Sequence, residues 1–262
     1  MKKISKIYMS LLLMFLYVPI FVLIVFSFNT TKSRTVFEGF TFDWYIRLFQ
    51  NELILSSLWN TLLISISAAT ISTILGTAAA IGINNMKKLP KAVVMNINNF
   101  PIINPEIVTG VSLMLLFVFF AARMNFNFGF VTLLIAHITF DVPYVILNVM
   151  PKFRQMNPNL YEAAQDLGCN PFKAFFKVVL PEIMPGIVSG FLIAFTFSLD
   201  DFIISYFTSG ATSQTLPITI YSMTRRKVSP EINALSTIIF LVVVIVLIVK
   251  NILENRSKEE RV

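Results

Sequence analysis

The feature that most constrains this sequence is a series of long, uncharged, apolar runs. The first extends from Tyr8 to Phe28, and the second lies within the uncharged stretch from Leu53 to Met86. An α-helix needs about 20 apolar residues to cross a hydrocarbon core about 30 Å thick. The first run is too long for the apolar part of a signal peptide, and no small-residue cleavage site follows it. We therefore expect retained membrane-spanning helices from the first run onward.

The composition supports lipid as the solvent of this chain. Only 13% of the residues are charged and 56% are hydrophobic, with a mean hydropathy of +0.75. A soluble domain carries about 25% charged residues, so this chain has too little polar surface to stay dissolved at its size. Phe outnumbers Trp by 26 to 2, which fits side chains that lie deep in hydrocarbon.

Two function classes are excluded by the same residues. The net charge of +7 comes from short basic clusters between apolar runs, with no basic stripe of the kind that binds nucleic acid. The chain has one cysteine, Cys169, and one histidine, His137, so neither an internal disulfide nor a Cys/His zinc site is possible.

Six apolar segments predict an all-α membrane protein with a single domain over residues 1–262. The predicted spans are 8–28, 59–83, 99–122, 129–150, 183–208 and 232–249. Lys and Arg are about twice as frequent on the side of both termini, which predicts that both termini are cytoplasmic. The external cluster of Arg225, Arg226 and Lys227 opposes that rule, and the sequence does not explain it. The long loops are then 29–58 and 209–231 outside, and 151–182 inside.

Small residues recur every four positions in two of the predicted spans. The two ridges are Ala68, Ser72, Gly76 and Ala80, and Gly186, Gly190, Ala194 and Ser198. Such ridges let helix backbones approach closely in lipid, although a direct role in substrate passage is an alternative. Asp201 lies 11 residues after Gly190, so we expect it to share the face of the second ridge and to point to protein or a cavity rather than lipid.

The internal loop, 151–182, predicts two short helices. Asn159 is a candidate N-cap with Glu162 three residues later, as in a capping box, and Gly168 is a candidate C′ residue. A second helix follows, and we expect Pro181 and Pro185 to interrupt it near residue 180, before the fifth span. Asn170 is its candidate N-cap and Pro171 its first residue.

The spacing within this loop resembles the EAA loop of ABC importer permeases. That family pattern is Glu-Ala-Ala, three residues, Gly, nine residues, Ile, any residue, Leu-Pro, and the chain departs from it only at Val178. The matching positions are Glu162, Ala163, Ala164, Gly168, Leu180 and Pro181. The resemblance implies the MetI-like fold, with a cytoplasmic coupling helix that sits in a groove on an ATP-hydrolysing subunit.

Further stretches are similar to the PotC-type permeases of spermidine/putrescine importers. They lie at 104–110, 195–205 and 216–237, although permeases for iron, sulfate or other solutes share some of them. The resemblance implies a subunit of a polyamine importer in the bacterial cell membrane. It also implies a second permease, two ATP-binding subunits and an extracytoplasmic polyamine-binding protein. The chain has no phosphate-binding loop of the Gly-x-x-x-x-Gly-Lys type, so we expect no cofactor on it, with ATP and Mg on a partner.

Four acids lie within or at the ends of the predicted spans, namely Glu106, Asp141, Asp200 and Asp201. A carboxylate at mid-bilayer costs about 2.5 to 3.5 kcal/mol on insertion scales, and no Lys or Arg lies deep in a span to pair with these acids. The pattern favours a cationic cargo, whose apolar stem would suit aromatic residues such as Tyr206. Simple helix-end roles are the alternative for Glu106 and the two adjacent aspartates, and His137 is more typical of an interhelical hydrogen bond.

Three rival functions remain open from the sequence. An ion-driven carrier would need inverted repeats with matching broken helices, which the sequence does not display. An intramembrane hydrolase would have to pair Ser189 with His137 outside any recognisable motif. A purely structural subunit is disfavoured by the acids within the spans.

Overall fold

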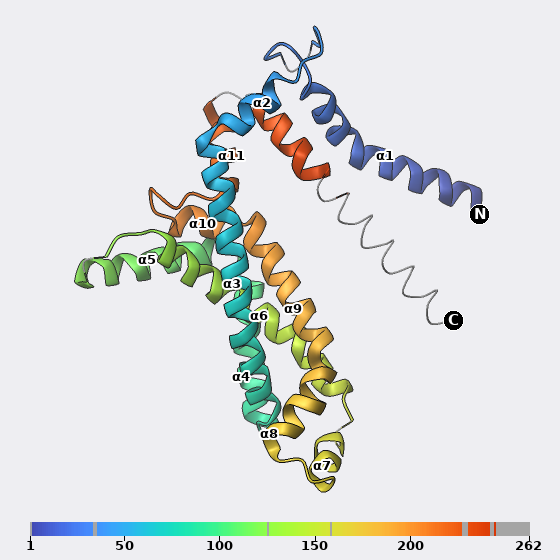
Figure 1. Ribbon diagram of the computed structural model, residues 1–262, viewed down its shortest axis with the longest axis vertical. Helices are drawn as coiled ribbons and strands as arrows, with labels where there is room; N and C mark the ends of the chain where they lie inside the picture. Colours follow the sequence, from blue (N-terminus) through green and yellow to red (C-terminus); the bar gives the residue numbers. More distant parts are fainter. Residues whose placement is uncertain are drawn as a thin grey trace. The chain divides into compact units, whose positions relative to one another are not determined.

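The computed structural model describes residues 2–33, 36–124, 126–157, 159–226, 230–241 and 244. The regular secondary structure of the described residues is helical, apart from a single isolated bridge between Asn29 and Phe40. The helices shown in Figure 1 are α1 (Lys2–Phe26), α2 (Asp43–Gln50), α3 (Glu52–Asn84), α4 (Lys88–Ile103), α5 (Glu106–Met124), α6 (Phe130–Gln155), α7 (Asn159–Asp166), α8 (Pro171–Ala174), the π-helical turn η1 (Phe175–Val179), α9 (Leu180–Asp200), α10 (Ile203–Thr208) and α11 (Leu216–Arg226).

Five helices of the described residues are long and apolar enough to cross a membrane. They are 5–26 within α1, all of α3, α5 and α6, and the continuous helix 171–200. A further apolar helix covers Pro230–Leu241, and most of the rest of the predicted sixth span lies outside the described residues. The predicted external loops also contain two helices, α2 and α11.

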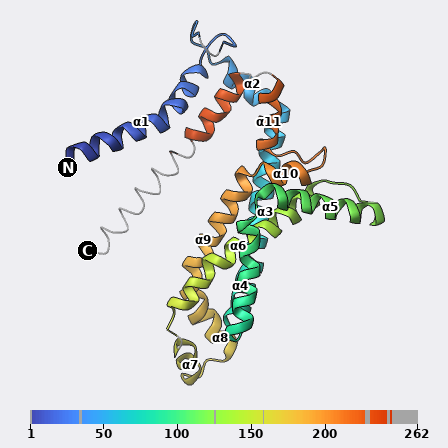
Figure 2. The ribbon, with the colours of Figure 1, turned by 180° about the vertical axis from the view of Figure 1, so that it is seen from behind.

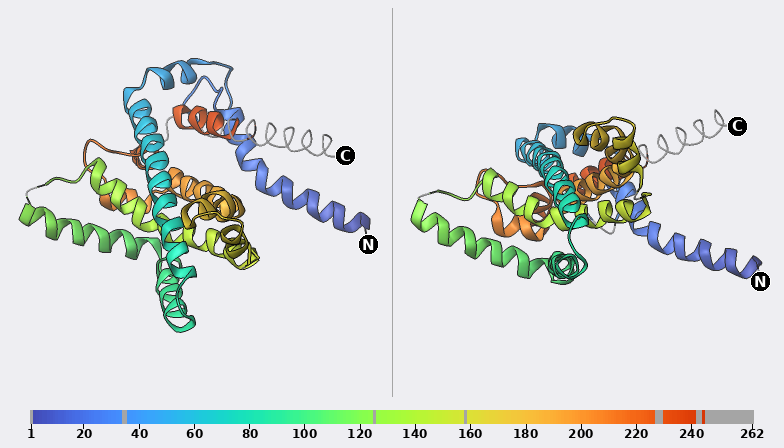
Figure 3. Two further views of the ribbon diagram at one scale, coloured as in Figure 1. Left: turned by 60° about the horizontal axis from the view of Figure 1, so that its bottom comes forward. Right: turned by 90° about the horizontal axis from the view of Figure 1, so that it is seen from below.

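The chain divides into two compact units, one of residues 1–55 with 220–262 and the other of residues 56–219. In the second unit α6 and α9 lie side by side, as Figures 1 and 2 both show. Helix α4 packs on α6, while α5 contacts mainly α10 and extends away from the α6–α9 pair (Figure 3). Helix α6 is therefore the centre of this unit.

Val145 of α6 is the point where the small-residue ridges of α3 and α9 meet the central helix. A Cβ atom built on Gly76 would lie 2.7 Å from the Val145 Cβ, and one built on Gly190 would lie 3.2 Å from the Val145 Cγ1. On Gly186 it would lie 2.8 Å from the backbone oxygen of Asn148. Larger residues could not occupy these positions without moving a helix. All members of both ridges are buried, which confirms the predicted close packing.

The third apolar segment differs from its predicted bounds of 99–122. Residues 99–103 belong to α4, which ends before Asn104, and α5 begins at Glu106. Asn104 is extended, with φ −71° and ψ 140°. Proline disfavours the helical conformation in the residue before it, so Pro105 separates the two helices.

The second short helix does not end at the prolines, so that prediction was wrong. The chain is helical without a break from Pro171 through Pro181 and Pro185 to Asp200. The π-helical turn η1 precedes Pro181 directly, and there the amide of Leu180 bonds to the oxygen of Phe175. This wider turn accommodates a proline that can neither donate a hydrogen bond nor fit a regular α-helical turn.

Candidate functional site

The break between α9 and α10 is organised by Asp201. Its carboxylate accepts hydrogen bonds from the amides of Ile204, at 3.2 Å, and Ser205, at 2.7 Å. Helix α9 ends at Asp200, and Asp201 is extended, so the prediction that Asp201 continues the ridge face was wrong. Its side chain is nevertheless only 5% exposed, because it caps α10 within the protein.

His137 of α6 joins this break from the neighbouring helix. Its Nε2 atom lies 3.0 Å from the Ser205 Oγ and 3.6 Å from the Asp201 Oδ2. The prediction of an interhelical hydrogen bond is thereby confirmed. Ser189, the alternative partner in a hydrolase, is exposed on α9.

Asp141, one turn further along α6, is completely buried. The Ser198 hydroxyl of α9 donates to its Oδ2 atom at 2.7 Å. Within the described residues its Oδ1 atom has no hydrogen-bond partner. A buried carboxyl group with one unsatisfied oxygen is costly, and packing alone does not account for it.

Glu106 reaches the same region from the start of α5. That helix packs closely on α10, since a Cβ atom on Gly110 would lie 3.0 Å from the Phe207 ring. Glu106 is exposed and interacts electrostatically with Asp200 and Asp201. Asp141 also interacts with Asp201. The four predicted acids therefore gather in one place, which we call the acidic cluster.

Aromatic rings lie beside the acidic cluster. Tyr144 lies three residues after Asp141 on α6, and its ring lies 4.6 Å from that of Phe197 and 5.2 Å from that of Phe140. Tyr206 is 53% exposed on α10, with its ring 5.5 Å from that of Phe202. Carboxylates next to aromatic faces can bind an ammonium group and its methylene stem.

Sequence reasoning missed Tyr144 as a member of this site, along with the hydroxyl partners Ser198 and Ser205. Ser198 lies on a small-residue ridge, where its size alone explained its presence. Tyr144 lies three residues after Asp141, which places it near the same face of a helix. That spacing was the signal that could have found it.

The helix α7 lies in the predicted coupling loop and ends as expected. Gly168 has φ 85°, in the left-handed region that favours glycine. Its amide donates to the backbone oxygen of Gln165 at 2.8 Å, and the amide of Cys169 donates to the backbone oxygen of Ala164 at 3.1 Å. These are the two bonds of a Schellman motif. The predicted N-cap was wrong, because Asn159 is already helical and the Asn157 side chain accepts from its amide.

The start of α8 confirms its predicted cap. The Asn170 side chain accepts from the amide of Lys173 at 2.8 Å, with Pro171 in the first turn. Around this pair of helices Phe172 and Phe176 are exposed. An exposed apolar surface of this kind is typical of a site that contacts a protein partner.

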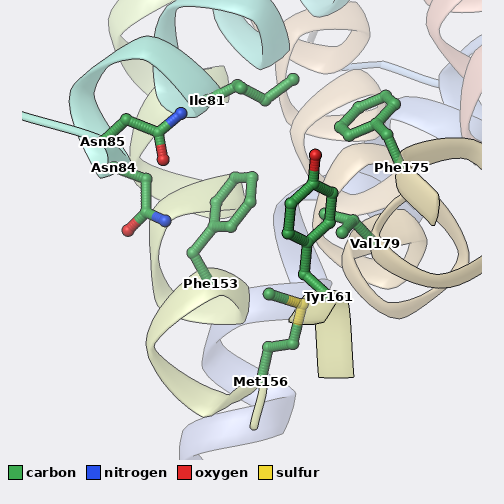
Figure 4. A pocket seen from close by; sticks show the side chains of 8 residues that line it. All are labelled: Ile81, Asn84, Asn85, Phe153, Met156, Tyr161, Phe175 and Val179. Carbon is green, nitrogen blue, oxygen red and sulfur yellow. The ribbon is translucent and has the colours of Figure 1, made fainter. Parts of the chain in front are cut away.

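A cavity of about 460 Å³ lies between α7 and η1 of the loop 151–182 and the ends of α3 and α6. Figure 4 shows its lining side chains, which are Ile81, Asn84, Asn85, Phe153, Met156, Tyr161, Phe175 and Val179. They come from α3, α6, α7 and η1 and from the residues directly after α3 and α6, and Tyr161 reaches into the space from α7. In the same helix Ala164 faces inward and is buried, whereas Glu162 and Ala163 are exposed.

These features define a class of protein. Several membrane-spanning helices, a cluster of acids among them and a capped helix pair with exposed aromatic rings are together typical of a transport permease that couples to a separate subunit. Residues 72–258 match the family described as "Binding-protein-dependent transport system inner membrane component". The chain belongs to this family of ABC importer permeases, which confirms the resemblance drawn from the loop 151–182. The ion-driven carrier and the hydrolase are thereby excluded, because ATP is hydrolysed by a separate subunit in this class.

Curated relatives cover nearly the whole chain. The putrescine transport system permease protein PotI of Escherichia coli (strain K12) is 39% identical over 256 residues, covering 95% of this chain and 89% of that protein. The spermidine/putrescine transport system permease protein PotC of the same strain is 35% identical over 251 residues, covering 96% and 93%.

The fold is also shared with a solved importer. A chain of the bacterial alginate ABC transporter, in complex with an alginate pentasaccharide-bound periplasmic protein, aligns with a TM-score of 0.72. The alignment covers 95% of this chain and 93% of that chain at 20% sequence identity. The all-α permease fold predicted from the sequence is thereby confirmed.

Proposed function

We propose that this chain moves polyamines, such as putrescine or spermidine, through the membrane as one permease subunit of a bacterial ABC importer. The acidic cluster carries this proposal, because Glu106, Asp141, Asp200 and Asp201 approach from three parts of the chain, and His137 is the basic side chain that the described residues place against them, with no Lys or Arg paired to these acids. The named substrates of the relatives support the same choice.

The electrostatics favour a cation of several charges. Carboxylates that repel one another in a medium of low dielectric are stabilised when positive charge enters between them. The interior lengths of α3, α5, α6 and α9 contain no Lys or Arg, so these four helices supply no permanent positive charge there. A polyamine offers ammonium groups on a flexible methylene stem, and Tyr144 and Tyr206 offer ring faces to that stem.

The four acids divide by exposure into two roles. Glu106 and Asp200 are exposed and can contact a passing ammonium group. Asp201 and Asp141 are held by hydrogen bonds, Asp201 to α10 and Asp141 to Ser198. We assign direct contact to the exposed pair and shaping of the local potential to the buried pair.

The test is uptake of radiolabelled putrescine by cells that lack their own polyamine importers. Glu106→Gln and Asp200→Asn should each lower uptake at limiting substrate while the complex still assembles. Glu182→Gln is the matched control, because Glu182 is an exposed acid in the first turn of α9, away from the cluster. Unlabelled spermidine should compete and sulfate should not. Normal uptake by an assembled Glu106→Gln, Asp200→Asn double variant would refute the cation site.

Asp201→Asn should also reduce uptake strongly, although Asp201 is assigned no direct contact with the substrate. The substitution keeps one acceptor for the amides that begin α10 and removes the negative charge beside His137. Assembly should therefore persist while transport falls. Full uptake in this variant would remove Asp201 from the site.

The coupling role is assigned to Glu162, Ala163, Ala164, Gly168 and Pro181. We propose that α7 docks in a groove of an ATP-binding subunit, with Glu162 paired to a basic residue there. The exposure of Glu162 and Ala163 beside the buried Ala164 supports a contact surface of this kind. The complete importer would hold a second permease, two ATP-binding subunits and an extracytoplasmic polyamine-binding protein.

Co-purification tests this contact. Glu162→Lys should weaken retention of the ATP-binding subunit on the tagged permease, because it places like charges together. Asp166→Lys is the control, since Asp166 is an exposed acid at the other end of α7. Unchanged retention in Glu162→Lys would contradict the coupling role.

The orientation of the chain follows from the same proposal. The coupling segment must face the cytoplasm to meet ATP, and both termini then lie on that side if the spans number six. A protease site placed at either end should be protected in intact cells and cut in inverted vesicles. Cleavage in intact cells would contradict this orientation.

A further inference from the structure

The connection between α1 and α3 is a folded segment of its own. The buried Asn29 side chain donates to the oxygen of Val36 at 2.8 Å and accepts from the amide of Glu38 at 3.0 Å. The Trp44 indole donates to the oxygen of Asn29 at 2.6 Å. The segment therefore holds α2 in a defined orientation relative to the end of α1.

Helix α2 has two apolar faces, and among the described residues one is buried while the other stays largely exposed. Trp44 and Leu48 are buried against the rest of the segment. At 100° per residue, Phe42, Ile46 and Phe49 fall within about 60° of one another on a different face. We call these three residues the α2 stripe, and they are 58%, 55% and 63% exposed.

The polar residues of α2 lie between these faces. Asp43 and Gln50 fall within about 20° of each other, at about 80° to 100° from Phe42 on the helix. Arg47 follows them, with its guanidinium 5.2 Å from the Trp44 ring. The helix therefore presents an uncharged stripe on one side and a polar edge beside it, as helices that lie in a membrane interface do.

The end of α1 indicates where the α2 stripe lies relative to the hydrocarbon core of the membrane. The apolar span within α1 ends at Phe26 after 22 residues, or about 33 Å, which matches a hydrocarbon core about 30 Å thick. Phe28 follows directly, and its ring lies 5.0 Å from the Phe40 ring and 5.5 Å from the Phe42 ring. The stripe thus begins at the boundary where the α1 span leaves the hydrocarbon.

We propose that the α2 stripe lies in the membrane interface, with Phe42, Ile46 and Phe49 inserted among the lipid acyl chains next to α1. Lipid fits better than a protein partner because the stripe is uncharged and continues the fully unburied apolar surface of the α1 span. Such a helix buries its apolar face about 5 to 10 Å below the headgroups. The α2 stripe would set how deeply α1 and the start of α3 lie in the membrane. This inference is independent of the cargo.

Spin labelling of the assembled importer in phospholipid vesicles tests the proposal. The background is Cys169→Ser, which removes the only cysteine. Nitroxides are placed singly by Phe42→Cys, Ile46→Cys and Phe49→Cys, with Gln50→Cys as the control on the polar edge. Power saturation then compares collisions with oxygen, which concentrates in lipid, against those with a water-soluble nickel chelate.

Labels on the α2 stripe should show an oxygen-to-nickel accessibility ratio severalfold above that of Gln50→Cys. Two outcomes would overturn the proposal. Dominant nickel accessibility at Ile46→Cys would place the stripe in water. Low accessibility to both reagents would show that a protein subunit covers it. Each labelled variant is used only if it retains the subunits of the unlabelled importer, and the three sites provide independent readings.

Discussion

The contact between α6 and α9 allows a prediction whose magnitude follows from the structure. A Cβ atom at Gly186 would lie 2.8 Å from the backbone oxygen of Asn148 and 3.3 Å from the Cα of Val149. The Lys152 Cγ atom would lie 2.7 Å from this Cβ and can rotate away, but the α6 backbone can move only as part of its helix. Gly186→Ala must therefore push the two helices apart or strain them locally.

The cost of such overpacking is typically about 1 to 3 kcal/mol. Alanine also gains about 1 kcal/mol over glycine within a helix, which would mask part of the effect in a single variant. Gly82 in α3 supplies the matched control, because a Cβ atom there would meet nothing within 4 Å. Both substitutions gain the same helix propensity, so the difference between them isolates the packing cost.

We expect Gly186→Ala to be less stable than Gly82→Ala by about 1 to 3 kcal/mol. The measurement is reversible unfolding of the purified chain in mixed micelles by SDS titration, followed by far-ultraviolet circular dichroism. Gly82→Ala should be as stable as the parent or more stable. Equal unfolding midpoints for the two variants would refute the reasoning, because they would show that α6 and α9 can separate without loss.

Three further predictions follow from single contacts. Gly168→Ala should destabilise the end of α7 by about 1 to 2 kcal/mol, because φ 85° is unfavourable for alanine even in open space, and amide hydrogen exchange should speed up there. Ser198→Ala should lower the free energy of unfolding by about 1 to 3 kcal/mol, because it removes the donor to the buried Asp141, whereas Ser189→Ala on the exposed side of α9 should not. Asn29→Ala should break the hydrogen bonds that fold the segment after α1, which limited proteolysis would detect as faster cleavage there.

Local signals in the loop 151–182 predicted the end of its first helix at Gly168 and the cap of its second at Asn170. Gly168 and Asn170 act through bonds to residues within five positions of themselves, so their roles are written in the adjacent sequence. The ridge residues were predictable for a similar reason, because a four-residue period specifies a helix face. Asn159 was misplaced as a cap, since neighbouring asparagines compete for the same helix start and only the fold selects between them.

The acidic cluster shows where sequence reasoning stops. The four acids could be named, but Asp201 was placed by assuming that α9 continued, and the helix ends one residue before it. The bonds to Ser198 and Ser205 join positions 57 and 68 residues away along the chain. No local pattern predicts such pairs, because they depend on how α6 packs against α9 and α10. The predicted helix end at Pro181 and Pro185 was wrong for a related reason, because the π-helical turn directly before Pro181 carries the helix past that proline and no local pattern announces such a turn.

Helix α6 runs from the acidic cluster to the cavity beside Tyr161 as one contiguous packed element. Asp141 and Phe153 are 12 residues apart on it, which is about 18 Å along the helix axis. Between them lies Val145, which packs directly against Gly76 of α3 and Gly190 of α9. If α7 moves against the cavity beside Tyr161, we expect α6 and α9 to move together. This joint movement would carry the displacement to the acidic cluster more readily than a chain of side-chain rotations. Packed helices of this kind respond as rigid bodies, and the cavity beside Tyr161 supplies the free volume that such a movement needs.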